Sequence, residues 1–329
     1  MLHVINRQTD PYFNMAAEEY VLTHLAGDDD CFMLWQNRPA IILGRNQNAW
    51  EEINSQYVRE QGIAVVRRLT GGGAVYHDLG NLNFTFIVHD QGKGFDFHRF
   101  GQPIINALAR LGVQAEMSGR NDILIAGHKF SGNAEYRYHD RLLHHGTLLF
   151  DCNLGVLSQA LQVKPQKIAS KGVKSVRSRV TNIKQHLPRE LSLEDFRQAV
   201  LTAAAEQFGS TWRDYHWSEA DLAVIAELQQ QKYSTWQWNF GQAPAFNVRR
   251  EKRYPFGEVD IRLQIERGHI VACHIFGDFF SNADVTQLAA RLQGAAFSPT
   301  GLQSALEQID VGQFIPGLDH HELLDLLLG

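Results

Sequence analysis

The stretch with the most chemistry-bearing residues runs from Arg67 to Asp78 and reads RRLTGGGAVYHD. The glycines at 71–73 let the backbone turn sharply and present its N–H groups to a ligand. The guanidinium groups of Arg67 and Arg68 suit forked pairing with a phosphate or a carboxylate. β-type residues lie on both sides, at 63–66 and 74–76, so this is not the strand-to-helix loop of the usual phosphate motifs. The pattern predicts an anion-binding turn, with a plain glycine-rich hairpin as the alternative.

Further cationic and polar residues could complete such a site. Lys129 stands in HKFSGNA, where small neighbours would let a ligand pass close to the backbone, and His145 stands in HHGTLLF. A basic segment at 164–179 is long enough to be functional. Each has an ordinary alternative: a solvated strand lysine, a hydrogen-bonded strand histidine and a solvated loop. The residues alone therefore indicate a cationic, glycine-lined pocket for an anion.

Composition limits the partners. Of 329 residues, 44% are hydrophobic and 20% are charged, which is typical of a globular protein. The net charge of −5 argues against a nucleic-acid partner, and no apolar run approaches the ~20 residues of a membrane span. Cys31, Cys152 and Cys273 form no disulfide framework, and adjacent histidines lack metal-ligand spacing, so no metal site is predicted. Because the N-terminus lacks a signal-peptide layout, a cytoplasmic location is expected.

Periodicity and capping residues place the elements that must position this site. Ser192 with Asp195 and Ser218 with Asp221 resemble capping boxes that open two helices, and Asn14 is expected to cap an earlier one. Polar and apolar residues alternate at 81–89, which predicts a half-buried strand. The other expected strands are 2–6, 31–36, 40–44, 122–125, 129–138 and 142–151, and the other expected helices are 50–61, 97–111 and 154–161.

The pattern restarts after the aromatic run at 233–246. Residues 249–253 are charged and are predicted to form a linker. Beyond them the sequence predicts a hairpin of strands 258–266 and 269–276, followed by helices at 284–292, 298–309 and 319–328. The chain is therefore expected to contain a large domain at 1–246 and a small α+β accessory domain at 250–329.

Several motifs in a fixed order resemble one known family. They are RRLTGGGAVYHD with GNLNFTF behind it, SGRNDIL, HKFSGNA, HHGTLLF, KGVKSVRSRVTNI and WQWNFGQAPAF. On these motifs the chain is identified as a member of the lipoate–protein ligase A family, within the biotin/lipoate protein ligases. The resemblance implies an α+β catalytic domain of mixed β-sheets flanked by helices. It also implies an enzyme that adenylates lipoate with ATP and Mg²⁺, releases pyrophosphate and transfers the lipoyl group to a protein lysine.

The resemblance also implies partners and site residues. The acceptors would be lipoyl domains of 2-oxoacid dehydrogenase E2 subunits and the glycine-cleavage H protein. No prosthetic group, nucleic acid or membrane is expected, and the chain is expected to be a monomer. Lys129 would contact both ATP and lipoate as the catalytic residue. The other ATP contacts would be Arg68, Gly73, Ala74, Val75, Tyr76, Asn121, Asp122, Arg177 and Arg179, and the lipoyl chain would lie along Arg67, Gly72 and His145.

Three rivals share parts of this pattern. A lipoyl or octanoyl transferase of the same fold needs no ATP and carries the acyl group on a cysteine, but the loop at 116–121 (EMSGRN) contains none. A biotin ligase would show a GRGR-type loop, which is absent from the sequence. A non-catalytic lipoate or nucleotide sensor should have lost Lys129 or an arginine of the glycine stretch, and neither is lost. The retained residues favour the ligase.

Overall fold

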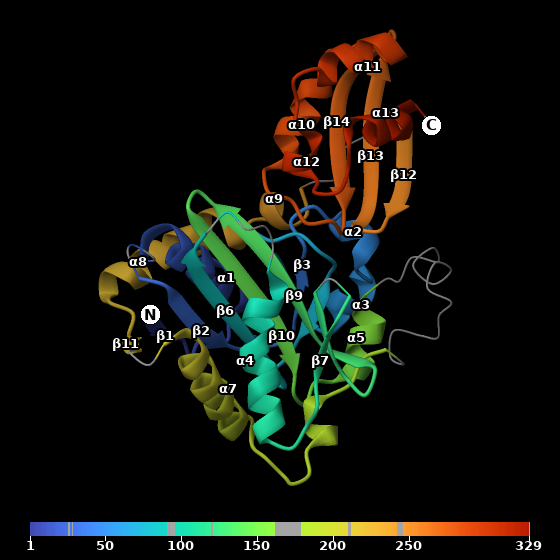
Figure 1. Cartoon of the computed structure of the whole chain (residues 1–329). Coiled ribbons are helices and arrows are strands. Elements are labelled where there is room, and N and C mark those ends of the chain that lie inside the picture. Colours follow the sequence, from blue (N-terminus) through green and yellow to red (C-terminus); the bar gives the residue numbers. More distant parts are fainter. Residues whose placement is uncertain are drawn as a thin grey trace.

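A large mixed sheet is the scaffold of the molecule. A computed structural model describes residues 1–25, 27, 29–90, 92, 96–119, 121–161, 179–209, 212–241 and 246–328. The strands of the sheet are β1 (Leu2–Ile5), β2 (Cys31–Trp35), β6 (Asn81–His89), β7 (Glu116–Ser118), β8 (Asp122–Ile125), β9 (His128–Tyr138), β10 (Arg141–Leu149) and β11 (Arg213–Tyr215). Within the described ranges they pair in the order β11-β1-β2-β6-β10-β9-β8-β7 (Figure 1). β1 runs parallel to β11 and β2, and the pairs from β2 onward are antiparallel.

Helices cover both faces of this sheet. α4 (Phe97–Arg110) and α7 (Leu193–Phe208) contact each other and enclose one core, which includes Phe86, Phe100 and Phe196. The other face carries α1 (Pro11–Tyr20) with the π-type turn η1 (Val21–Leu25), and α8 (Glu219–Leu228) with η4 (Gln229–Tyr233). In the part of the chain that the structure describes, no helix has the length and apolar character to span a bilayer.

Capping residues decide where these helices begin. Ser192 and Ser218 cap α7 and α8 as predicted, because each hydroxyl accepts a hydrogen bond from the backbone N–H three residues further on. The predicted cap at Asn14 is wrong, since Asp10 caps α1 and Asn14 lies inside the helix. The buried Asn14 amide donates to the Gln36 carbonyl at 2.8 Å and so ties the helix to the chain that follows β2.

A second, three-stranded sheet carries the glycine turn. β3 (Ala40–Leu43) pairs in parallel with β4 (Ala64–Arg67) and antiparallel with β5 (Val75–His77), and residues 68–74 connect β4 to β5. The single helix predicted at 50–61 is wrong, because Ile53 is extended and separates α2 (Ala49–Glu52) from α3 (Ser55–Glu60). Residues of these helices and of α5 (Leu154–Ala160) share a core with the small sheet. Two short helices, η3 (Ile183–His186) and α9 (Trp236–Asn239), follow.

The C-terminal residues build a sheet and a core of their own. β12 (Val248–Tyr254), β13 (Gly257–Glu266) and β14 (His269–Gly277) pair antiparallel in that order. They are followed by α10 (Val285–Leu292), α11 (Pro299–Leu306), α12 (Val311–Phe314) and α13 (His320–Leu328). The predicted linker at 249–253 is wrong, because these residues lie within β12. Arg249 donates to the buried Asp260 of β13 at 2.8 Å, so the charges belong to a paired strand.

The C-terminal sheet sits against the loops of the larger region (Figure 1). The Gly72 N–H donates to the Phe279 carbonyl at 3.3 Å, and the Gly277 N–H donates to the Asn46 carbonyl at 2.8 Å. A side chain at position 71 would not fit, since a Cβ on Gly71 would lie 2.3 Å from the Phe279 carbonyl oxygen. The glycine turn therefore serves as a contact surface for the C-terminal residues.

Candidate active site

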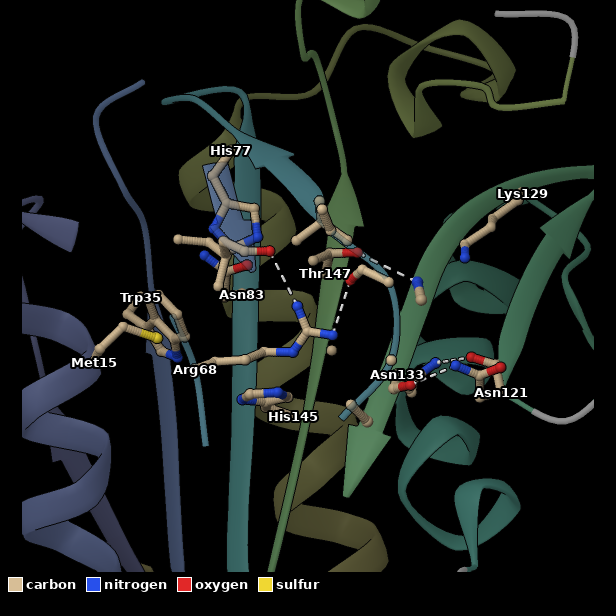
Figure 2. A pocket seen from close by; sticks show the side chains of 18 residues that line it. Met15, Trp35, Arg68, His77, Asn83, Asn121, Lys129, Asn133, His145 and Thr147 are labelled. Carbon is tan, nitrogen blue, oxygen red and sulfur yellow. Dashed lines mark hydrogen bonds between the residues drawn. The ribbon is translucent and has the colours of Figure 1, made fainter. Parts of the chain in front are cut away.

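A cavity opens where the glycine turn faces β6, β9 and β10 (Figure 2). Its lining residues are Met15, Trp35, Ile42, Arg68, Gly72, Gly73, Ala74, Val75, His77, Asn83, Asn121, Lys129, Gly132, Asn133, Ala134, His145, Gly146 and Thr147. Residues far apart in the sequence thus meet around one space. Of the predicted site residues, the cavity wall contains Arg68, Gly72, Gly73, Ala74, Val75, Asn121, Lys129 and His145.

Lys129 supplies a positive charge to the cavity wall from β9. Its ammonium nitrogen lies 2.7 Å from a carboxylate oxygen of Asp122, which is therefore placed as its counter-ion. Gly132 leaves room for this ammonium, since a Cβ there would lie 2.9 Å from Lys129 Nζ. The Lys129 N–H donates to the carbonyl of Arg179 at 2.8 Å, so the end of the basic segment runs beside the lysine. Arg177 lies outside the described residues.

Asn121 is held rigidly at the same side of the cavity. Its Nδ2 donates to the Asn133 carbonyl at 2.6 Å, and Asn133 Nδ2 donates back to the Asn121 carbonyl at 3.0 Å. Asn133 Oδ1 in turn lies 3.3 Å from His144 Nε2, and His144 Nδ1 lies 2.8 Å from the buried Glu135. These hydrogen bonds within the protein preorganise the strand end.

His145 belongs to a hydrogen-bond chain. Its Nδ1 lies 2.8 Å from a Glu18 oxygen, and its Nε2 lies 2.8 Å from Thr70 Oγ1. Because an ionised carboxylate can only accept, Nδ1 carries the proton and the Thr70 hydroxyl donates to Nε2. Thr70 Oγ1 accepts from Arg68 Nε at 2.8 Å. Sequence reasoning missed Glu18 and Thr70, although an acid within the buried run MAAEEY was a usable signal for Glu18.

Most N–H groups of the Arg68 guanidinium already donate hydrogen bonds to backbone carbonyls. Its Nη1 donates to the Ile42 carbonyl at 3.1 Å, and its Nη2 donates to the carbonyls of Gly71 at 2.6 Å and Gly73 at 2.9 Å. Burial lowers the pKa of Arg68 to about 10, against the opposing effect of Glu18, so the group stays protonated at neutral pH. Arg68 thus shapes the glycine turn and gives the cavity a positive field.

The structure places Arg67 and Tyr76 away from the cavity wall. Neighbouring residues of a strand point to opposite sides, so Arg67 and Arg68 cannot face the same space. Arg67 is fully buried, and burial lowers its pKa to about 9, which leaves it charged at neutral pH. Its guanidinium donates to the carbonyls of Gly44, Arg45, Gln47, Trp238 and Asn239. Tyr76 lies in the core beneath the small sheet.

Replacing Arg67 should therefore affect stability more than lipoate recognition. Arg67→Met should lower the free energy of unfolding by about 3 kcal/mol or more, because buried carbonyl oxygens lose a charged donor. Urea denaturation measures this loss. Arg59→Met, at an exposed position of α3, is the matched control and should change stability by less than about 0.5 kcal/mol. If Arg67→Met is as stable as the wild type but has a raised KM for lipoate, this prediction is wrong and Arg67 contributes to lipoate binding.

His77 should make the stability of the protein pH-dependent. Burial, reinforced by Arg68 and His145, lowers its pKa to about 3. The unfolded chain then binds the extra proton between pH 6.5 and 3, so stability falls as the pH falls through that window. His77→Gln should remove about 2 kcal/mol of the stability loss between pH 6.5 and 5, measured by urea unfolding. His98→Gln, at an exposed position of α4, should keep the wild-type dependence, and an unchanged dependence in His77→Gln would contradict this account.

Comparison with known proteins settles the family. Residues 10–205 match the model of the lipoyl protein ligase A/B catalytic domain, and residues 243–327 match that of the bacterial lipoate protein ligase C-terminus. The chain belongs to the lipoyl protein ligase A/B family. It is 43% identical to a lipoate–protein ligase of Bacillus subtilis, covering 99% of this chain and 100% of that protein. It is 44% identical to lipoate–protein ligase 1 of Staphylococcus aureus, covering 98% of each. The chain is accordingly an enzyme of the ligase class.

Solved structures show the same fold. P. falciparum LipL1 in complex with lipoate covers 99% of this chain and 98% of its own, with a TM-score of 0.81 and 23% identity. Lipoate–protein ligase A bound with ATP covers 74% and 99%, with a TM-score of 0.65 and 27% identity. A structure from a structural analysis of a two-part lipoate protein ligase and its E2 lipoyl domain from Thermoplasma acidophilum covers 75% of this chain and 98% of its own, with a TM-score of 0.66 and 29% identity. The predicted lipoate ligase fold, with mixed sheets flanked by helices, is confirmed.

Proposed function

We propose that the cavity at the glycine turn is where this ligase joins lipoate to AMP and then passes the lipoyl group to a lysine of an acceptor protein. The observation that carries the proposal is the position of Lys129, whose ammonium stands in the wall of a cavity also lined by Met15, Trp35 and Ile42. A carboxylate and a triphosphate repel each other, so their reaction needs a fixed positive charge. The apolar side chains suit the hydrocarbon tail of lipoate.

The chemistry has two steps. The lipoate carboxylate attacks the α-phosphorus of ATP, pyrophosphate leaves, and lipoyl-AMP forms. The uncharged amine of the acceptor lysine then attacks the lipoyl carbonyl, and AMP leaves with the electron pair of the broken C–O bond. The nitrogen gives up one proton to solvent, which leaves a neutral amide. Lys129 would stabilise the charge on phosphate oxygens in the first step and the departing AMP in the second.

The other predicted site residues keep the roles that the family resemblance gave them, with changes that follow from their surroundings. We propose that Gly73, Ala74, Val75 and Asn121 contact ATP, and that Gly72 and His145 lie along the lipoyl chain. Arg68 would act through its charge, since carbonyls hold most of its N–H groups. Asp122 would set the position of Lys129. Arg179 would act close to Lys129. The predicted ATP contact at Tyr76 is not proposed, since Tyr76 lies in the core of the small sheet, and Arg177 lies outside the described residues.

Mg²⁺ is proposed to enter with the phosphates of ATP. Among the described residues, no group of three or more His, Cys, Asp or Glu side chains is arranged to hold a metal ion by itself. Mg²⁺ commonly keeps several water ligands and binds through substrate phosphates and one or two carboxylates. Asp122 is the carboxylate nearest to Lys129 and is the candidate for such a contact.

The acceptors are proposed to be lipoyl domains of E2 subunits and the glycine-cleavage H protein. Support comes from the Thermoplasma acidophilum lipoylation system, whose structural analysis names a two-part ligase together with its E2 lipoyl domain. We further propose that the chain acts as a monomer in the cytoplasm and is divided into a catalytic domain at 1–246 and an accessory domain at 250–329. The separate core of the C-terminal residues supports that division, although β12 starts at Val248, two residues before the proposed boundary.

The decisive assay is lipoate-dependent exchange of labelled pyrophosphate into ATP, with purified protein and without acceptor. Exchange that requires lipoate, ATP and Mg²⁺ together is the expected result. Absence of exchange, with lipoate still bound, would favour the non-catalytic sensor. Acyl transfer from a carrier without ATP would favour the transferase.

The cysteines should be dispensable for this reaction. Burial raises the pKa of Cys31 and of Cys273 to about 12 and also raises that of Cys152, so little reactive thiolate forms at neutral pH. We expect a variant lacking all three cysteines to keep most of its ligase activity and to lose only some stability. Mass spectrometry for an acyl-thioester is the complementary measurement. A trapped thioester, with activity lost in the matching Cys→Ala variant, would reverse this view.

A further inference from the structure

Among the described residues, two buried hydrogen-bond donors in the cavity wall have no protein acceptor. Asn83 is 1% exposed and His77 is 3% exposed, and both line the cavity. Asn83 Oδ1 accepts from Asn81 Nδ2 at 2.7 Å, which leaves the Asn83 NH₂ group on the other side of the amide. In the part of the chain that the structure describes, neither Asn83 Nδ2 nor His77 Nε2 has a hydrogen-bond partner.

The hydrogen-bond network fixes which His77 nitrogen carries the proton. Asn37 Oδ1 accepts from Asn14 Nδ2 at 2.8 Å, so Asn37 presents its NH₂ group to His77. That group donates to His77 Nδ1 at 3.1 Å. A neutral imidazole whose Nδ1 accepts must hold its proton on Nε2. The free Nε2 is therefore a donor, as the free Asn83 amide nitrogen is.

These donors lie across the cavity from the reacting end. Figure 2 shows His77 and Asn83 near Trp35, and Lys129 and Asn121 on the opposite side. A lipoate whose carboxylate meets Lys129 would extend its tail toward Asn83 and His77. The tail ends in a dithiolane ring, whose sulfur atoms are weak acceptors and polarisable.

The polar residues on this face of β6 differ in how far their hydrogen bonds are satisfied: among the described residues Asn81 Oδ1, like Asn83 Nδ2, has no partner, whereas Thr85 is fully bonded. Side chains of β6 alternate, so Asn83 and Thr85 share the face opposite to Phe84. Thr85 Oγ1 donates to Glu18 at 2.8 Å and accepts from Trp35 Nε1 at 2.9 Å, and its hydrogen bonds are complete. A buried donor left unpaired destabilises the protein, and a leucine at position 83 would avoid that cost.

We propose that Asn83 and His77 recognise the dithiolane sulfurs and so make this enzyme select lipoate over saturated fatty acids of the same length, such as octanoate. The proposal rests on the function proposed above. An alkyl tail would bury the same two donors without offering an acceptor, so octanoate would bind less well than its size and apolarity predict.

The test compares lipoate and octanoate in the full-length protein. Acyl-AMP formation is followed by pyrophosphate exchange, and calorimetric titration with each acid alone measures binding without catalysis. Asn83→Leu keeps the size of the side chain and removes its donor. We expect it to lower the lipoate-to-octanoate ratio of kcat/KM, and of binding affinity, by roughly fivefold or more.

Thr147→Val is the matched control, because Thr147 also lines the cavity but its Oγ1 accepts from the Gly132 N–H at 3.3 Å. It should change both acids alike and leave their ratio unchanged. If Asn83 had a purely structural role, Asn83→Leu would likewise weaken lipoate and octanoate equally. An unchanged lipoate-to-octanoate ratio in Asn83→Leu therefore overturns the proposal. If the wild type binds both acids but forms no acyl-AMP, the proposed function is wrong. The ratio of lipoate to octanoate affinity, measured by calorimetry, still tests the role of Asn83 in that case.

A second measurement needs no variant. Octanoate analogues with one sulfur in place of the methylene at position 6 or 7 restore a single acceptor in an open chain. The wild type should bind at least one of them more tightly than octanoate, and Asn83→Leu should narrow that difference. Equal affinity of the wild type for octanoate and both analogues would contradict recognition of sulfur, as expected if a bound water satisfies the two donors.

Discussion

Lys129→Ala should slow both half-reactions by about a hundredfold or more, because the same ammonium is proposed to stabilise charge on the phosphate oxygens in each step. Pyrophosphate exchange measures adenylation, and transfer from preformed lipoyl-AMP measures the second step. Folding should be almost unaffected. The backbone of Lys129 stays anchored, since its N–H donates to Arg179 at 2.8 Å and its carbonyl accepts from Thr181 at 2.9 Å.

Two further lysine variants sharpen this prediction. Lys129→Arg should not restore the rate, because Gly132 lies so close to the ammonium that a wider guanidinium cannot take the same position. Lys184→Ala is the control, since Lys184 also pairs with a carboxylate, that of Asp151 at 2.6 Å, but does not line the cavity. Near-normal adenylation by Lys129→Ala would contradict a catalytic role and indicate that Lys129 is an ordinary solvated surface lysine.

The second large effect is expected from Gly71→Ala. Its methyl group would collide with the Phe279 carbonyl oxygen, so the glycine turn and the segment that follows β14 must separate, and we expect the C-terminal sheet to move with that segment. If the docked sheet closes the site against water during adenylation, pyrophosphate exchange should fall about tenfold or more, whereas transfer from preformed lipoyl-AMP should persist. Both half-reactions are measured on the same preparation, and a dye pair placed on the two regions reports their separation.

Gly73→Ala is the control for docking, because no atom lies within 4 Å of the position that its new methyl group would take. It should leave the separation of the dyes unchanged. The competing view is that the C-terminal region docks the acceptor protein. If Gly71→Ala adenylates lipoate normally but no longer transfers it, the C-terminal region does not close the site during adenylation. That result would support docking of the acceptor protein instead.

Local sequence signals predicted the elements whose cause is local. Alternation correctly predicted the strand at Asn81–His89, and Ser192 and Ser218 cap their helices from within one turn. The prediction that this strand is half-buried is wrong, because β6 lies inside the sheet and residues 81–88 are buried on both faces. The linker at 249–253 failed because its charges are balanced from another strand. Arg249 donates a hydrogen bond to Asp260, and residues 249–253 alone give no sign of that partner. Long-range pairing overrode the local signal.

The candidate site divides in the same way. Motifs located the glycine turn, Lys129 and His145, since each is a short run of residues. They could not tell which of two adjacent arginines faces the cavity, because that depends on the strands around them. Glu18 reaches His145 from a helix 127 positions earlier in the chain, and only the folded structure brings the two together.

The adjacent histidines of β10 have a consequence for how the sheet is threaded. His144 meets the buried Glu135 on one face, and His145 meets Glu18 on the other, each at 2.8 Å. If β10 slipped by one residue in either direction, one acid would keep a histidine and the other would face Leu143 or Gly146. Without an imidazole, Glu18 would keep the Thr85 hydroxyl as a donor, and Glu135 would keep the Asp96 N–H. A buried carboxylate that loses a hydrogen-bond partner is destabilised, so each wrong register carries an electrostatic penalty. The two neighbouring histidines thus help to specify the register of β10 during folding, independently of any role in substrate binding.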